Sequence, residues 1–377
     1  MAAMTSSPND PPRDLIQQVL AAAAARQPLR ITGGDTKAFY GQPTDGERLS
    51  TTGWSGIVSH EPSELVVTVR AGTPLAELEA ALAEQGQCLP FDPPRFGATS
   101  TIGGVVAAGL AGPARATAGG VRDFLLGLQF INGRGEWLTF GGQVMKNVAG
   151  YDVSRVMAGA MGTLGVITDI SLKVLPVAPA EATLVFSMGQ HDALEQLHRW
   201  GGQPLPLNAS CWVKDQTQVD APELLFLRLR GAVAAVEAAC ERLAREAGGT
   251  RMDNAQAGPD WAACRDQTLP FFTAPSADLC LWRLSVPQTA PVLALPYAPL
   301  IEWQGAQRWL WAPASAAAEI RSAAAAVNGH ATLFRAGVDG APGVPRFDRE
   351  SPALAAITQR LRAEFDPAGI FNPGRMG

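Results

Sequence analysis

Short apolar runs separated by glycine- and proline-containing turns dominate the first half of the chain. Apolar positions at helical spacing predict a helix over 13–26, which Pro28 ends. A second helix is predicted from an N-cap at Thr73, with Pro74 at its first position, to a stop at Gly86. Runs rich in β-branched residues predict strands over 29–32, 56–60, 64–70, 124–131, 136–140 and 165–175.

The second half has a different order of elements, which begins after Pro176 and Pro179 interrupt the last strand. A ferredoxin-like series of strand, helix, two strands, helix and strand is predicted over 183–188, 191–200, 210–214, 223–230, 232–247 and the residues after Gly249. A similar series of strand, hairpin, helix and strand is predicted over 279–286, 300–304, 308–312, 315–327 and 331–335, with Ser315 as the N-cap. We expect both halves to share one antiparallel sheet with helices on one face. The tail, 361–377, is apolar and rich in turns, so we expect it to dock onto the first domain.

Composition narrows the class of protein. The 377 residues, 47% of them hydrophobic, can fill two cores. A net charge of −5 without a basic run excludes a nucleic-acid-binding surface. The polar start lacks the features of a signal peptide, and no run of about 18 apolar residues predicts a transmembrane helix. Five scattered cysteines fit reduced thiols better than a disulfide framework or an iron–sulfur site. We therefore expect a cytoplasmic protein.

Three polar residues of the helix predicted over 191–200 allow two interpretations. His191, Glu195 and His198 fall at i, i+4 and i+7, close to one helix face, where they could meet a metal ion. The same spacing also describes polar residues on a solvated face. No other histidine or carboxylate cluster lies nearby in the sequence, so we predict no metal site.

Three glycine-rich segments, 31–37, 101–112 and 159–168, carry the strongest functional signal. Glycine suits places where the backbone approaches a ligand closely and offers N–H groups to an anion, whereas in an ordinary core it forfeits packing. Together the segments predict a large, phosphate-bearing cofactor along the main chain, with simple turns as the alternative. No Gly-x-Gly-x-x-Gly follows a strand and no Gly-Lys-Ser/Thr occurs, so a Rossmann or P-loop site lacks support.

Five motifs, in this order, give the chain a resemblance to a known family. They are the loop before Phe39, 101–104 (Thr-Ile-Gly-Gly), 146–152 (Lys-Asn-Val-Ala-Gly-Tyr-Asp), 162–168 (Gly-Thr-Leu-Gly-Val-Ile-Thr) and 371–375 (Phe-Asn-Pro-Gly-Arg). With them the chain resembles flavoproteins of the vanillyl-alcohol-oxidase (PCMH) type. Through 109–115, 121–124 and 140–152 it is similar, within that type, to the FAD-binding accessory subunits of bacterial glycolate oxidase, also called glycolate dehydrogenase.

The resemblance implies an α+β fold in four parts. A tail and helix (1–28) precede a two-subdomain PCMH-type FAD-binding domain (29–178). A ferredoxin-like α+β cap domain with an antiparallel sheet (179–336) follows, and a C-terminal segment (337–377) returns to the FAD domain.

The resemblance also implies FAD as the cofactor. It places 33–37 at the pyrophosphate, 92–93, 102–104 and Gly109 along the flavin and ribityl chain, 165–167 beside the adenosine end, and Asn372 near the isoalloxazine. The implied cofactor-binding residues are Thr32, Gly33, Gly34, Asp35, Thr36, Lys37, Asp92, Pro93, Thr101, Ile102, Gly103, Gly104, Gly109, Gly165, Val166, Ile167 and Asn372. A Lys37 that points inward adds charge to the site, whereas a solvent-facing lysine is the alternative. Covalent attachment in this family uses a histidine or cysteine, which the loop lacks, so we expect non-covalent FAD.

One departure from the family shapes the functional hypothesis. Members that oxidise 2-hydroxy acids carry a histidine-rich metal site in the cap, and nothing between 180 and 335 matches its motif. The catalytic residues therefore stay unknown. Arg115, Arg122 and Arg335 could hold a carboxylate, and ordinary salt links explain them equally well.

The resulting hypothesis is an FAD-carrying subunit of a heteromeric glycolate-oxidising complex that supports electron transfer. A companion flavin subunit would perform the chemistry and an iron–sulfur subunit would take the electrons, in the cytoplasm or on the inner face of the membrane through these partners. The alternatives are an autonomous FAD-dependent oxidoreductase and a cofactor-free scaffold. The tryptophans of the second half favour a partner-facing surface, with core packing as the other interpretation: Trp282, Trp303, Trp309 and Trp311.

Overall fold

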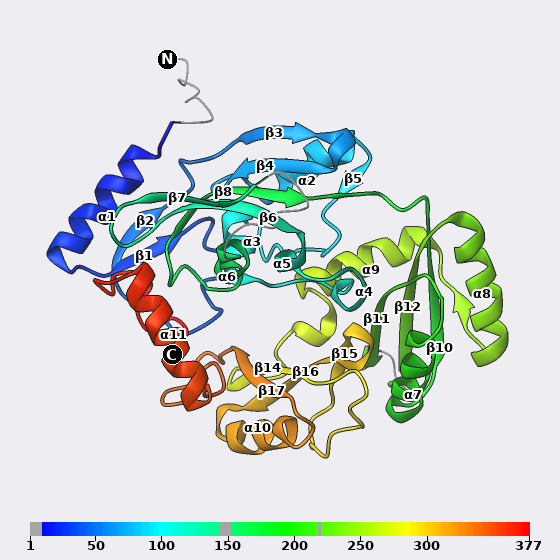
Figure 1. Cartoon of the computed structure of the whole chain (residues 1–377). Coiled ribbons are helices and arrows are strands. Elements are labelled where there is room, and N and C mark those ends of the chain that lie inside the picture. Colours follow the sequence, from blue (N-terminus) through cyan, green and yellow to red (C-terminus); the bar gives the residue numbers. More distant parts are fainter. Residues whose placement is uncertain (1–9, 143–151, 218–219) are drawn as a thin grey trace.

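Two antiparallel sheets organise the chain (Figure 1). The computed structural model describes residues 10–142, 152–217 and 220–377. A five-stranded sheet belongs to the first half and an eight-stranded sheet to the second, and the C-terminal segment returns to the first half. The mixture of helices with antiparallel sheets confirms the predicted α+β class.

The five-stranded sheet has the order β3-β4-β8-β6-β7. Its strands are β3 (Ile57–Glu61), β4 (Val66–Arg70), β6 (Leu125–Ile131), β7 (Trp137–Gly141) and β8 (Val166–Lys173). The middle strand, β8, is buried along nearly its whole length, which explains its unbroken β-branched sequence. The Asn-Gly turn at Asn132 joins β6 to β7, as the sequence predicts.

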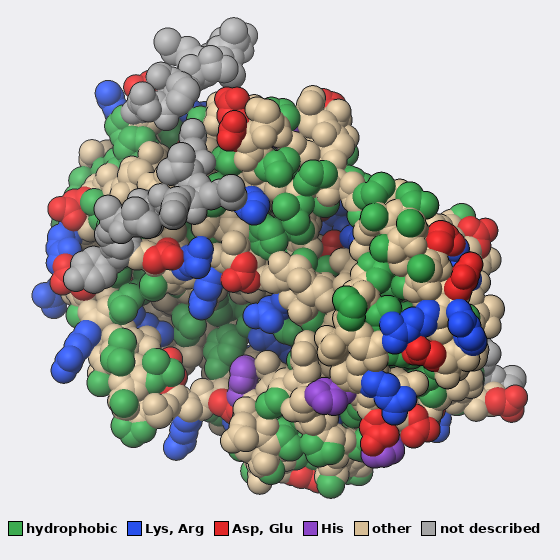
Figure 2. Space-filling model, turned by 45° about the vertical axis from the view of Figure 1, so that its right-hand side comes forward, with side chains coloured by type: hydrophobic (Ala, Val, Ile, Leu, Met, Phe, Trp, Pro, Cys, Tyr) green, Lys and Arg blue, Asp and Glu red, His purple; other side chains and the backbone are tan. Residues whose placement is uncertain are grey.

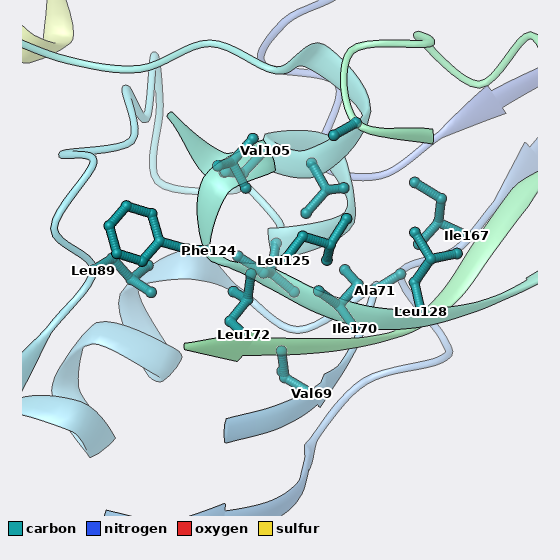
Figure 3. Close-up of a cluster of buried hydrophobic side chains, with 14 of the residues drawn as sticks. Val69, Ala71, Leu89, Val105, Phe124, Leu125, Leu128, Ile167, Ile170 and Leu172 are labelled. Carbon is teal, nitrogen blue, oxygen red and sulfur yellow. The ribbon is translucent and has the colours of Figure 1, made fainter. Parts of the chain in front are cut away.

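Short helices pack on this sheet and close its core. The helices of this half are α2 (Leu75–Glu84), α3 (Ile102–Ala108), α4 (Arg115–Ala118), α5 (Val121–Phe124) and α6 (Val153–Met157). Figure 3 shows side chains of α3, α5 and the central strands meeting there, among them Val105, Phe124 and Ile170. Burial of this apolar surface holds α3 in place.

A second layer joins the two ends of the chain. The parallel pair β1 (Leu29–Thr32) and β2 (Glu47–Ser50) packs with α1 (Arg13–Ala25), and the tail follows α11 (Pro352–Phe365). The Leu29 N–H donates to the Ile370 carbonyl at 2.7 Å, and Leu29 bridges to Phe371. The predicted docking of the tail onto the first domain is therefore confirmed. A further small pair joins β5 (Gln87–Cys88) to β9 (Leu175–Pro176).

The eight-stranded sheet consists of a ferredoxin-like half and a second half of similar strand order, without a helix between its first two strands, and the two halves meet edge to edge. Its strands, in sheet order, are β13 (Thr250–Arg251), β10 (Ala180–Ser187), β12 (Glu223–Gly231), β11 (Leu207–Lys214), β15 (Leu300–Glu302), β16 (Gln307–Pro313), β14 (Leu279–Ser285) and β17 (His330–Arg335). The halves join where β11 pairs with β15. This arrangement confirms the prediction of one shared antiparallel sheet.

Helices cover the two faces of the eight-stranded sheet unequally. The outer face packs against α7 (Gln190–Gly201), α8 (Val233–Ala247) and α10 (Ala317–Ala325). The inner face, which turns toward the first half, carries α9 (Asn254–Asp266) (Figure 1). Because α9 lies there, the expectation of helices on one face only is wrong.

Several local predictions are corrected by the structure. Helix α2 begins after Pro74, because the Thr73 hydroxyl is used by Gly56 and Arg70 rather than as a cap. Helix α10 begins after Ala316, since a 3-10 turn occupies 314–316 where Ser315 was expected to cap it. Trp282, Trp303 and Trp309 are buried, which agrees with the core-packing interpretation of these tryptophans.

Candidate functional site

The loop that follows β1, residues 33–38, requires glycine at two positions. A Cβ on Gly33 would lie 2.3 Å from the Thr101 hydroxyl oxygen, and one on Gly34 would lie 1.5 Å from the Thr99 carbonyl oxygen. Both contacts are far below van der Waals distance, so the bare backbone here packs directly against the segment that leads into α3. The sequence predicts this close approach.

The same loop presents a row of unused donors. Within the described part of the chain, the backbone N–H groups of residues 33–37 have no hydrogen-bond acceptor. They border a cavity of about 100 Å³ whose lining includes Thr32, Thr101, Gly104 and Asn372. Consecutive N–H groups around a polar cavity are suited to an anion such as a diphosphate, so the residues present fit the phosphate part of FAD.

Thr101 sets the geometry at the other side of the cavity. It is the N-cap of α3, and its hydroxyl accepts from the Gly104 N–H at 3.3 Å. The N–H of Gly103 donates instead to the Ala71 carbonyl, and a Cβ there would come within 2.8 Å of that oxygen. Gly103 therefore serves the packing of α3, whereas Gly104 lines the cavity.

Lys37 points inward. Its Nζ donates to the Ser100 hydroxyl at 2.9 Å and approaches the Arg95 carbonyl at 3.4 Å. Burial lowers the pKa of the Lys37 ammonium from 10.5 to about 8, and the Asp266 carboxylate opposes that effect. The structure thus favours the inward alternative, in which the amine belongs to the site.

The C-terminal tail closes the cavity. The Asn372 side chain accepts from the Ile31 N–H and donates to the Met161 carbonyl, both at 2.8 Å. The Arg375 guanidinium donates to the carbonyls of Lys37, Ala38 and Gln42. Sequence reasoning proposed Asn372 but missed Arg375, although it ends the same tail motif. It also missed other lining residues: Arg30, Ile31, Ala38, Thr44, Ala107, Ala108 and Met161.

The remaining predicted residues lie outside this cavity. Asp92 forms an ion pair with Arg228 of β12 at 2.5 Å, within the contact between the two halves. Ile102 is buried in the core, and Gly109 ends α3 in a left-handed conformation against Gly159. Gly165 begins the run that leads into β8, whose first two residues are Val166 and Ile167, both buried. Pro93 follows Asp92 in the same loop. The flavin and adenosine contacts assigned to these residues stay predictions.

Two further expectations concern metals and motifs. The His191 and Glu195 side chains are exposed and lie 3.5 Å apart on α7. Among the residues that the structure describes, no three His, Cys, Asp or Glu side chains are grouped to hold a metal ion.

No described helix is long and apolar enough to cross a membrane. The motif at 146–152 falls almost entirely outside the described residues.

Comparison with known proteins agrees with the geometry. Residues 11–141 match the model of a family described as FAD binding domain. The chain is 44% identical over 362 residues, 96% of either chain, to "Glycolate oxidase subunit GlcE" of Escherichia coli (strain K12). The chain belongs to the GlcE family. As a member of this family it is an FAD-binding oxidoreductase subunit.

Two further comparisons match this chain over a shorter stretch or at a lower identity. "Glycolate oxidase subunit GlcD" of Bacillus subtilis (strain 168) is 31% identical over 173 residues, 45% of this chain and 37% of the relative. A solved alkyldihydroxyacetonephosphate synthase aligns over 96% of this chain and 75% of its own, with a TM-score of 0.67 and 15% identity. That likeness shows the fold alone.

Proposed function

We propose that this chain is the FAD-carrying subunit of a complex that oxidises a 2-hydroxy acid, with glycolate as its substrate. The observation that carries the proposal is the row of unused N–H groups at 33–37, in a loop that requires glycine at positions 33 and 34. The 44% identity to a glycolate oxidase subunit supports the substrate class. We place the FAD domain at 29–178, the cap at 179–336 and the returning segment at 337–377.

In this proposal, residues 33–37 bind the cofactor and Asn372 shapes the cavity. The N–H groups of 33–37 would bind the pyrophosphate oxygens, and the Lys37 ammonium would balance their charge. Asn372 holds β1 against the Met161 backbone, which fixes the wall of the cavity. FAD, when bound, would supply a redox centre that takes up electrons and passes them on. The loop contains no histidine or cysteine, so we propose that binding is non-covalent.

We propose a companion flavin subunit and an iron–sulfur subunit as partners. The partial match to a GlcD subunit supports the first, because it indicates that two chains of related sequence occur among glycolate oxidase subunits. The five cysteines of this chain are free thiols, four of them buried, and this supports a cluster held by another chain. We place the assembly in the cytoplasm, with the inner face of the membrane as the alternative.

The visible absorption spectrum of the purified chain tests FAD binding. Wild type should show bound flavin, whereas Gly34→Ala should lose at least about tenfold in FAD affinity because its Cβ would collide with the Thr99 carbonyl. Gly53→Ala is the matched control, since its Cβ would meet no atom within 4 Å. Equal FAD affinities for the two variants would contradict the loop assignment.

The same preparation separates the two other candidate functions. A colourless wild-type chain that FAD does not stabilise would indicate a scaffold, because a true binder gains about 3 kcal/mol at a hundredfold excess of ligand over its Kd. Oxidation of glycolate by the isolated chain with an artificial electron acceptor would indicate an autonomous oxidoreductase.

A further inference from the structure

A second, larger cavity adjoins the proposed cofactor cavity, which is the one that residues 33–37 border. It has a volume of about 920 Å³, and Thr36 lines both spaces. Its walls come from the first half, the cap and the C-terminal segment. We call it the arginine cleft, after the residues that define it: Phe39, Arg95, Phe96, Gln267, Arg335 and Arg346.

The charges of the arginine cleft do not balance. Arg95 forms an ion pair with Glu79, and the Asp266 carboxylate of the lining pairs with Arg265 at 2.7 Å. Within the described residues, no carboxylate pairs with Arg335 or Arg346. Lys37 adds a further cation beside the cleft. This space therefore carries a net positive charge.

Arg335 is held in place but incompletely bonded. Its Nη2 donates to the Gln267 side-chain oxygen at 2.9 Å, and its guanidinium carbon lies 4.5 Å from the centre of the Phe39 ring. Its Nε is buried without an acceptor, as is Nη1 of Arg346. The contact with the Phe39 ring orients the Arg335 guanidinium and leaves its Nε–H without an acceptor.

Buried donors without acceptors are costly, and the cost is larger when the group is charged. Burial lowers the pKa of both guanidinium groups, yet an arginine remains charged at neutral pH. An anion with two oxygens offers acceptors to such donors, because carboxylates and guanidinium groups match in geometry.

We propose that the arginine cleft binds a small carboxylate through Arg335 and Arg346. Of the three arginines that the sequence offered for a carboxylate, only Arg335 lines this space. The Arg115 guanidinium stacks on Trp303 and that of Arg122 donates to the Ala158 carbonyl. The inference rests on the proposed function for the identity of the acid, because the cleft adjoins the cofactor cavity and glycolate is the proposed substrate.

The free arginine donors could also serve the phosphates of the cofactor, and the experiment separates the two sources. Purified FAD-loaded chain is titrated with sodium glycolate, with uncharged glycolamide, and with sodium chloride at equal ionic strength. Thermal midpoint and flavin absorption are recorded for wild type, Arg335→Gln, Arg346→Gln and Arg360→Gln. Arg360 is the control, because it is exposed on α11 and its replacement removes the same charge. The FAD affinity of every variant is measured in parallel.

Glycolate should raise the thermal midpoint of wild type and Arg360→Gln, whereas glycolamide and chloride should not. Arg335→Gln and Arg346→Gln should bind glycolate at least tenfold more weakly and keep the FAD affinity of wild type. Glycolate affinities equal to wild type in both cleft variants, or no glycolate response from FAD-loaded wild type, would overturn the inference. A tenfold loss of FAD affinity in the cleft variants without a glycolate effect would assign the arginines to the cofactor. Failure of wild type to bind FAD at all would instead refute the proposed function.

Discussion

At the scale of single residues, Lys37 is notable because burial shifts the pKa of its ammonium and because it lines the candidate site. The hydrogen bonds described for its Nζ go to neutral oxygens of Thr36, Arg95 and Ser100. Desolvation without a direct counter-ion lowers the pKa of its ammonium to about 8. The charge of this residue therefore changes close to physiological pH.

FAD affinity should fall as the pH rises through 8 and above. Below this pKa the Lys37 ammonium is protonated and attracts the phosphates, and above it the neutral amine no longer does. Bound phosphate favours the charged form, so the midpoint should lie at or above pH 8. We expect a loss of about tenfold between pH 7 and pH 10, measured by titration of FAD fluorescence. In Lys37→Met this pH dependence should disappear, and a profile identical to wild type would contradict the assignment.

At the scale of elements, an ion pair between the buried Arg228 and the part-buried Asp92 joins the two halves of the molecule. Arg228 of β12 donates to the Asp92 carboxylate at 2.5 Å and to the Asn208 side-chain oxygen at 2.6 Å, and its guanidinium stacks on Trp261 of α9. Trp261 in turn donates to the Thr183 hydroxyl. The loop at 88–94, the cap sheet and α9 are thus held together by one polar network.

Asp92→Ala should lower the free energy of unfolding by about 3 kcal/mol, because it leaves the buried Arg228 charge without its carboxylate. Denaturation in urea measures the change. Glu237→Ala, which removes an exposed partner of Arg251, should destabilise the chain far less, because solvent screens that pair. Arg228→Met combined with Asp92→Ala should recover part of the loss. Equal effects of the two single substitutions would show that the Asp92 pair is not critical for stability.

At the scale of the whole molecule, the proposed cofactor cavity depends on chain segments from both ends. Asn372 connects the Ile31 N–H to the Met161 carbonyl, and Arg375 holds three carbonyls of the loop that follows β1. Asn372 adopts a left-handed backbone conformation, φ 40°, which asparagine tolerates better than most residues. The tail is therefore a structural wall of the site.

Asn372→Ala should destabilise the chain by about 2 kcal/mol, because it leaves a buried donor and a buried acceptor unpaired. FAD affinity should fall with it, since the cavity wall loses its fixed position. Thermal unfolding and FAD titration measure the two effects. Asn254→Ala, at an exposed position of α9, should leave FAD affinity unchanged. An Asn372→Ala chain with normal FAD affinity would show that the tail is dispensable for the site.

The sequence alone determined the elements whose signals are local. The predicted strands correspond to β3, β4, β6, β7 and β8, because β-branched runs between turn residues favour the same structure in most contexts. Gly33 and Gly34 were identifiable for the same reason: a residue type without a side chain signals a backbone that must come close to something. Helix α9 escaped prediction, since Gly258 and Pro259 lower its intrinsic helix propensity and only its packing against the cap sheet compensates.

Only the tertiary structure decided which polar groups face one another. Asp92 was expected at the flavin and is found with Arg228, 136 positions away. The sequence could not distinguish Arg335 from the two other candidate arginines, and the structure places it in a cleft with free donors. Pairing of charges depends on contacts between distant segments, and burial then sets their energies. A loop that requires glycine can be recognised in the sequence from that residue type. The role of an arginine or a carboxylate depends on the partners that folding brings to it, so only the tertiary structure shows it.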